Sequence, residues 1–98
     1  MALTWDDKSC KDQSGKIVCM SYRAQLPHWG MASVHTHIQS PGEAFLDCLG
    51  LGIEMHPLGR TELLDALNPA ETVLLKTLKQ QAEWCLEAMV VIGTPGEP

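Results

Sequence analysis

The longest pattern of apolar and polar positions in this chain is helical, and it begins at Asn68. Asn68 is a preferred N-cap residue, Pro69 is favoured in the first helical turn, and Glu71 lies three residues after the cap. Residues 70–92 contain neither glycine nor proline. These signals predict a C-terminal helix of roughly 23 residues, about 35 Å long at ~1.5 Å per residue.

The polar side chains of this predicted helix gather within about 100° of its circumference, so apolar side chains cover most of the rest. One apolar stripe contains Leu74, Leu75, Leu78, Ala82, Cys85, Leu86 and Met89, and a second contains Val73, Trp84 and Val91. A helix on a small sheet needs only one such stripe. The second stripe needs another helix of the same chain or, because twofold homodimers are the commonest assembly, a second protein. We therefore predict an interface at Val73, Gln81, Trp84 and Val91.

Alternation of apolar and polar residues predicts two strands, at 16–24 and 29–39. Residues 3–5 predict a short third strand, separated from the first by a polar loop. The segment 51–60 contains structure breakers and is expected to be a connection, although its alternating apolar residues also allow a short extra strand. A small antiparallel meander fits these strands.

Helical signals return after the second strand. The segment Ser40-Pro41-Gly42-Glu43 has the form of a capping box, which predicts a short helix at 41–49. Its apolar face would contain Ala44, Phe45, Cys48 and Leu49. Residues 61–67 predict two further helical turns before Asn68 starts the long helix in a new direction.

The expected fold class is α+β, with a small antiparallel β-meander of two to three strands packed against two or three helices, including the long C-terminal helix. Residues 1–92 are expected to form a single domain, and residues 93–98 a disordered tail. The predicted core comprises Val18, Met20, Tyr22, Val34, Ile38, Phe45, Leu49, Leu74, Leu78 and Met89.

Composition and charge narrow the possible partners. The net charge is -5, and residues 41–98 hold nine acidic side chains against three basic ones. Phosphate backbones are bound by clustered Lys and Arg, so we expect no nucleic-acid partner. The first residues lack the pattern of a signal peptide, and no apolar stretch approaches the ~18 residues of a membrane span. We therefore expect a cytoplasmic protein without membrane contact, whose four cysteines are reduced.

The sharpest candidate for chemistry is the pair His35 and His37. On a strand these two side chains point to the same face, where they could bind one transition metal such as zinc. Cys19 on the adjacent strand is a candidate third ligand and the most plausible reactive thiol. Spacing does not fix the remaining ligands, and two polar residues on the open face of a sheet are the favoured explanation of the pattern. No catalytic residue is assigned.

Two classes of function follow from these observations. The first is a small non-enzymatic cytoplasmic protein that acts through protein–protein interaction, as an adaptor or an inhibitor of a larger assembly. It would use the long helix or the exposed sheet face, as a homodimer or with a larger protein, and it would need no cofactor. The alternative is a small-ligand or transition-metal-binding protein, a small enzyme included, that uses His35, His37 and Cys19 with zinc. The first class is favoured, and enzymatic activity is not expected.

Overall fold

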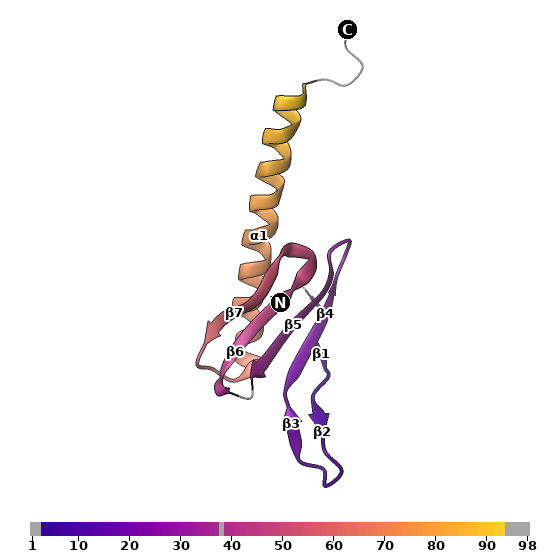
Figure 1. Ribbon diagram of the computed structural model, residues 1–98, viewed down its shortest axis with the longest axis vertical. Coiled ribbons are helices and arrows are strands. Elements are labelled where there is room, and N and C mark those ends of the chain that lie inside the picture. Colours follow the sequence, from indigo (N-terminus) through magenta and orange to yellow (C-terminus); the bar gives the residue numbers. More distant parts are fainter. Residues whose placement is uncertain (1–2, 38, 94–98) are drawn as a thin grey trace.

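The computed structural model describes residues 3–37 and 39–93, and it gives only the backbone of residues 17–19 and 41. Within this part of the chain, five antiparallel strands form one sheet in the order β1-β4-β5-β6-β7, and one long helix packs across it (Figure 1). A separate two-stranded sheet pairs β2 with β3. The elements are β1 (Asp6–Asp7), β2 (Cys10–Lys11), β3 (Ile17–Cys19), β4 (Ser21–Leu26), β5 (Gly30–His37), β6 (Ser40–Cys48), η1 (Leu49–Leu51), β7 (Ile53–Gly59) and α1 (Leu63–Ile92).

The predicted fold, a meander of two to three strands with two or three helices, is wrong. The described residues instead form a five-stranded antiparallel sheet and a single long helix. Two strands in this sheet explain most of the difference, because the segment 41–49 was predicted to be a helix and 51–60 a connection. The extra strand that the alternation at 51–60 allowed is present as β7.

Of the residues predicted to form a short helix at 41–49, residues 41–48 belong instead to β6, the strand between β5 and β7, and Leu49 begins η1. The buried side chains of β6 are Ala44, Leu46 and Cys48, which recur at every second position as in a strand. The helical interpretation was wrong because Phe45 and Leu49 also match a helical spacing and the capping signals agreed with it. Pairing on both sides supplies backbone hydrogen bonds that a local capping motif cannot outweigh.

The helix α1 begins six residues earlier than predicted, at Leu63, and does not break at Asn68. Glu62 occupies the N-cap position, and Pro69 lies inside the helix. Ala66, Leu67 and Ala70 are all buried, so the turns on both sides of the proline pack into the core as one rigid element. The predicted end at Ile92 is confirmed. There the Gly93 N–H donates to the Met89 carbonyl at 3.0 Å, and the φ of Gly93 is 83°, a value that favours glycine.

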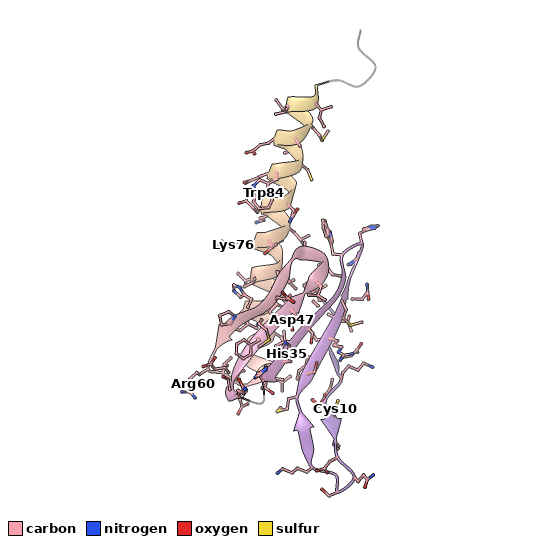
Figure 2. All side chains as sticks on the ribbon, viewed as in Figure 1. Cys10, His35, Asp47, Arg60, Lys76 and Trp84 are labelled. Carbon is pink, nitrogen blue, oxygen red and sulfur yellow. The ribbon has the colours of Figure 1, made fainter. Side chains whose placement is uncertain are left out.

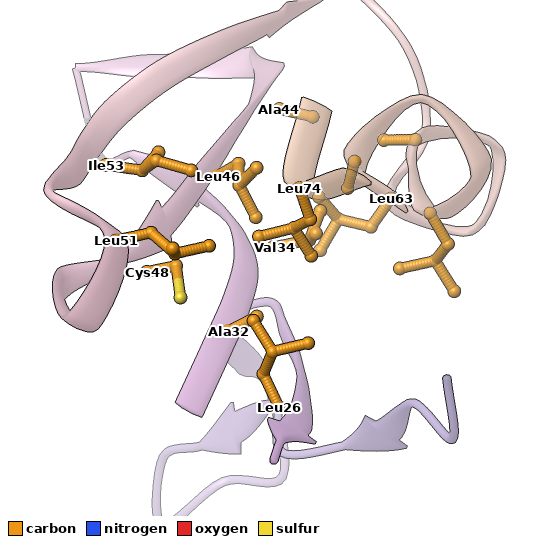
Figure 3. Close-up of a cluster of buried hydrophobic side chains, with 13 residues drawn as sticks. Leu26, Ala32, Val34, Ala44, Leu46, Cys48, Leu51, Ile53, Leu63 and Leu74 are labelled. Atoms are coloured by element: carbon orange, nitrogen blue, oxygen red, sulfur yellow. The ribbon is translucent and has the colours of Figure 1, made fainter. Parts of the chain in front are cut away.

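The core lies between the sheet and the first half of α1 (Figure 3). Strands β4 to β7 and η1 contribute Leu26, Ala32, Val34, Ala44, Leu46, Cys48, Leu51 and Ile53, and α1 contributes Leu63, Ala66, Leu67, Ala70 and Leu74. No aromatic side chain belongs to this buried cluster of the described residues.

The structure confirms some of the predicted core residues and contradicts others. Val34 and Leu74 are buried as predicted, and Tyr22 and Leu78 are partly buried against the core. The predictions for Met20, Leu49 and Met89 are wrong, because these side chains are 42%, 72% and 63% exposed. Met20 lies at the break between β3 and β4, Leu49 in η1, and Met89 near the C-terminal end of α1. Phe45 is half-buried and alternates with the core residues of β6, which places it on the open face.

Two of the predicted core positions are not tested, because Ile38 and the side chain of Val18 lie outside the described part of the chain. The same holds for the predicted disordered tail, of which only Gly93 is described. The predicted strand at residues 3–5 is shifted, since the short edge strand β1 is Asp6–Asp7 and pairs with Arg23 and Tyr22 of β4.

Candidate functional site

The candidate site is the second half of α1, which extends past the sheet with no other described element beside it (Figure 1). The last partly buried residue of the helix is Gln81, and every residue from 82 to 92 is exposed. We call residues 82–92 the projecting half. At ~1.5 Å per residue it is about 16 Å long.

The projecting half is apolar around most of its circumference. Nine of its eleven residues are apolar, and the two polar residues, Glu83 and Glu87, lie one helical turn apart on the same side. Leu86 is 62% exposed, Val90 81% and Val91 85%. A helix that is apolar on nearly all sides is normally buried. This surface is therefore the most unusual feature of the molecule.

The projecting half also lacks the packing that usually stabilises a helix. Most helical stability in proteins comes from tertiary contacts of an apolar face, and an isolated segment shorter than ~12–15 residues is marginal in water. Its last residues, Val90, Val91 and Ile92, are β-branched and therefore poor helix formers. A partner that covers the projecting half would supply the stability that the chain does not provide by itself.

The four residues predicted as an interface occupy different environments. Trp84, labelled in Figure 2, is 54% exposed. Val91 is 85% exposed, and both residues belong to the projecting half. Gln81 is half-buried at the point where the helix leaves the sheet. Val73 packs against the core. The structure therefore separates Val73 from the other three, and the use of this set as an interface stays a prediction.

A groove at the base of α1 was not predicted from the sequence. Its volume is about 480 Å³, and it is lined by Leu3, Leu26, Asn68, Glu71, Thr72, Leu74, Leu75 and Leu78. One carboxylate oxygen of Glu71, Oε2, accepts hydrogen bonds from the Leu3 backbone N–H at 3.1 Å and from Trp5 Nε1 at 2.8 Å. These bonds hold the N-terminal segment against the helix, so that it forms one wall of the groove. The only sequence signal for it was the apolar stripe at Leu75 and Leu78.

On the open face of the sheet, His35 forms the clearest polar cluster (Figure 2). Its Nε2 contacts Oδ2 of Asp47 on β6, and its Nδ1 lies 3.0 Å from the carbonyl oxygen of Thr36. The other oxygen of Asp47, Oδ1, accepts a hydrogen bond of 2.6 Å from the Met55 N–H of β7. The His35 ring also faces Phe45, with 6.2 Å between ring centroids. The cluster thus joins β5, β6 and β7.

The predicted metal ligands His35, His37 and Cys19 occupy different surroundings in the two sheets. A register irregularity separates His35 from His37, and the exposed His37 accepts at Nδ1 a 3.1 Å hydrogen bond from the Gln39 N–H. The backbone of Cys19 pairs with Cys10 in the small sheet, while its side chain lies outside the description. Among the described residues, no group of three His, Cys, Asp or Glu side chains could hold a metal ion. The zinc hypothesis stays a prediction.

Other titratable groups have structural explanations. The Ser14 hydroxyl and the Lys16 N–H donate hydrogen bonds to Asp12, and they lower the pKa of that carboxyl group. The backbone N–H of Ser9 lowers the pKa of Asp7 in the same way. Burial raises the pKa of the Cys48 thiol, which makes a thiolate nucleophile unfavourable there. These groups stabilise turns and the core.

In comparisons with known proteins, the chain matches no protein-family model, no curated protein and no solved structure. Within residues 3–37 and 39–93, no helix combines the length and the apolar character that crossing a membrane requires.

Proposed function

We propose that this protein is a non-enzymatic cytoplasmic interaction protein, an adaptor or an inhibitor of a larger assembly, which binds its partner through the projecting half of α1. The observation that carries the proposal is the exposure of nine apolar residues on eleven consecutive helical positions. Proteins rarely leave a continuous apolar surface in water without a use, and such surfaces mark interaction sites. The exposed thiol of Cys85 is compatible with a reducing compartment such as the cytoplasm.

The projecting half is too small to form a stable complex by itself. Burying a large aliphatic side chain contributes roughly 1.5–3 kcal/mol, so the five large aliphatic residues of this region contribute about 10 kcal/mol in total. They are Leu86, Met89, Val90, Val91 and Ile92. Association costs an estimated ~4–15 kcal/mol. Burial of these aliphatic residues alone therefore gives only weak binding. A stable complex has to cover further apolar surface as well, and Trp84, Leu75 and the groove provide it.

The test is the size of the native complex in the cell that makes the protein. We expect the tagged chain, purified under mild conditions and weighed by native mass spectrometry, to be part of an assembly larger than its own 10.8 kDa. The double variant Met89→Glu/Ile92→Glu places two charges on the projecting half and should leave the assembly. The matched control Lys76→Glu changes a charge on the polar side of the same helix and should remain bound.

Two results would contradict the proposal. A wild-type chain that is monomeric in the cell has no stable partner for α1. An assembly that survives the double variant with unchanged composition uses another surface. Circular dichroism of the purified variants shows whether the fold is intact, and both substituted residues are more than half exposed, so the domain should tolerate the change.

A further inference from the structure

Six apolar residues of α1 follow the spacing of a coiled-coil seam. From Leu75 the steps to Leu78, Ala82, Cys85, Met89 and Ile92 are three, four, three, four and three residues. Alternating steps of three and four keep side chains on the line where two helices pack knobs into holes. The line is 18 residues long, from 75 to 92, or about 27 Å at ~1.5 Å per residue. We call these six residues the seam.

The seam lies beside the face with which α1 packs on the sheet, and Leu78 belongs to both, because it is partly buried against the core. At about 100° per residue, its centre lies roughly 75° around the helix from the centre of the five buried residues of α1, which are Leu63, Ala66, Leu67, Ala70 and Leu74. Leu75 is 54% exposed, Met89 63% and Ile92 76%. Apart from the partly buried Leu78, every seam residue is exposed, so a helix from outside can be placed along the seam.

We propose that this outside helix belongs to a second copy of the chain, and that the two α1 helices pair antiparallel along their seams. The inference rests on the proposed function and names the partner of the same surface. In an antiparallel pair centred between residues 83 and 84, Leu75 of one copy meets Ile92 of the other. Leu78 then meets Met89, and Ala82 meets Cys85. The small residues fall at the centre, where the helices can approach closely, and the large ones fall at both ends.

The groove at the base of α1 gives the antiparallel pair its second contact. Leu75 and Leu78 line this groove together with Leu3 and Leu26, and its volume is about 480 Å³. In the antiparallel arrangement Met89 and Ile92 of the second copy lie at the level of Leu78 and Leu75. The apolar tip of each helix therefore fills the groove of the other copy. Such a reciprocal contact is the defining property of a twofold interface.

The charges of the helix are compatible with self-pairing. Glu83 and Glu87 lie more than about 100° from the centre of the seam, so both carboxylates stay in water when two seams meet. Lys76 lies on the same polar side. No like charges are forced together, and no charge is buried without a partner. A parallel pair would instead place Leu75 on Leu75 and Ile92 on Ile92, and it would leave both grooves without an apolar occupant.

The test measures the association of two single variants, Ile92→Glu and Leu75→Lys, and of their 1:1 mixture. The measurement is sedimentation equilibrium over a wide range of concentration. The wild type should be a dimer. Ile92→Glu or Leu75→Lys alone puts a charge opposite an apolar residue in two layers of its homodimer, which should weaken dimerisation by about 100-fold. In a 1:1 mixture of the two variants, a dimer can form from one copy of each. One of its two outer layers then places the introduced ammonium opposite the introduced carboxylate, and the layer at the other end is that of the wild type. The mixture should therefore recover the dimer. Recovery requires residues 75 and 92 of different copies to be neighbours, which a parallel pair does not provide.

The matched control is Val90→Lys, a substitution at an 81% exposed residue roughly 110° from the seam centre. It should leave the dimer intact. A short bis-maleimide provides a measurement on the unmodified sequence, because the two Cys85 thiols flank the twofold axis and should cross-link.

Three other outcomes would each contradict one part of the proposal. A wild type that is monomeric at every concentration overturns pairing with a second copy, while a heteromeric native complex would still support the proposed function. A mixture that fails to recover the dimer overturns the antiparallel order. Dissociation by Val90→Lys as strong as that by Ile92→Glu overturns the seam.

Discussion

The backbone at Gly50 passes so close to Trp29 that a Cβ atom at position 50 would lie 1.8 Å from the Trp29 carbonyl oxygen. Trp29 ends the turn between β4 and β5, where its N–H donates to the Leu26 carbonyl at 3.1 Å. We predict that Gly50→Ala destabilises the fold by about 1–3 kcal/mol, because the added methyl group displaces backbone that the turn holds in place. Urea unfolding measures the change.

Gly42→Ala is the matched control for this substitution. Its Cβ would meet only the guanidinium of Arg60, at 3.6 Å, and a flexible side chain can move away. The stability of this variant should stay within about 0.5 kcal/mol of the wild type. Equal unfolding midpoints for the two variants would show that residues 29 and 50 are not in close contact.

The elements that the sequence predicts well are those in which period and local signals agree. In the predicted strands at 16–24 and 29–39, Ala24, Ala32 and Val34 share the buried face as the alternation indicates. The segment 41–49 was misassigned because its capping motif and its apolar spacing both fit a helix. Only pairing with β5 and β7 shows that it is a strand, and a local pattern does not contain that pairing.

The candidate site could be predicted in part. Trp84 and Val91 were singled out because the helix has more apolar surface than one sheet can cover, and both are exposed. The position at which α1 leaves the sheet could not be predicted, since it depends on the true start at Leu63. The groove could not be predicted either, because it joins Leu3 and Leu26 to a helix that lies far along the sequence.

Pro69 leads to a second prediction. A proline inside a helix removes one backbone hydrogen bond and costs up to ~3 kcal/mol relative to alanine. Pro69 is exposed, while its neighbour Ala70 is fully buried. We therefore predict that Pro69→Ala raises the free energy of unfolding by about 1–3 kcal/mol without changing the fold. Thermal unfolding followed by circular dichroism measures it, and a lower midpoint would mean that α1 needs the proline for its geometry.

Glu71 provides a third prediction, because its carboxylate holds Trp5 and the N-terminal segment against α1. Glu71→Ala leaves the indole N–H of Trp5 and the N–H of Leu3 without this acceptor, which should cost about 1–3 kcal/mol. Glu71→Gln keeps one amide oxygen and should retain part of that stability. The fluorescence of Trp5 reports the local change, and Trp84→Phe reduces the background. If the Ala and Gln variants unfold at the same midpoint, the acceptor oxygen has no role in holding this segment.

The zinc hypothesis yields a fourth prediction. Both ring nitrogens of His35 already contact protein atoms, Asp47 Oδ2 and the Thr36 carbonyl oxygen. A metal ion would have to displace them, so we predict that zinc leaves the thermal midpoint of the wild type unchanged. Stoichiometric zinc in the native protein, lost in His35→Ala/His37→Ala, would instead support the metal-binding function. Asp47→Asn is a useful companion, because it weakens the histidine contact while leaving an oxygen for the Met55 N–H.

The buried thiol of Cys48 predicts how stability depends on pH. Burial raises its pKa above the ordinary 9.0, so the folded state binds the thiol proton more tightly than the unfolded state does. This contribution is complete below the unfolded pKa of 9.0 and is lost as pH rises through the folded pKa. The free energy of unfolding of the wild type should therefore fall above about pH 9. In Cys48→Val, which has no titrating thiol at this position, the fall should be shallower. Urea unfolding at several alkaline pH values measures both slopes, and parallel slopes would assign the alkaline loss to other groups.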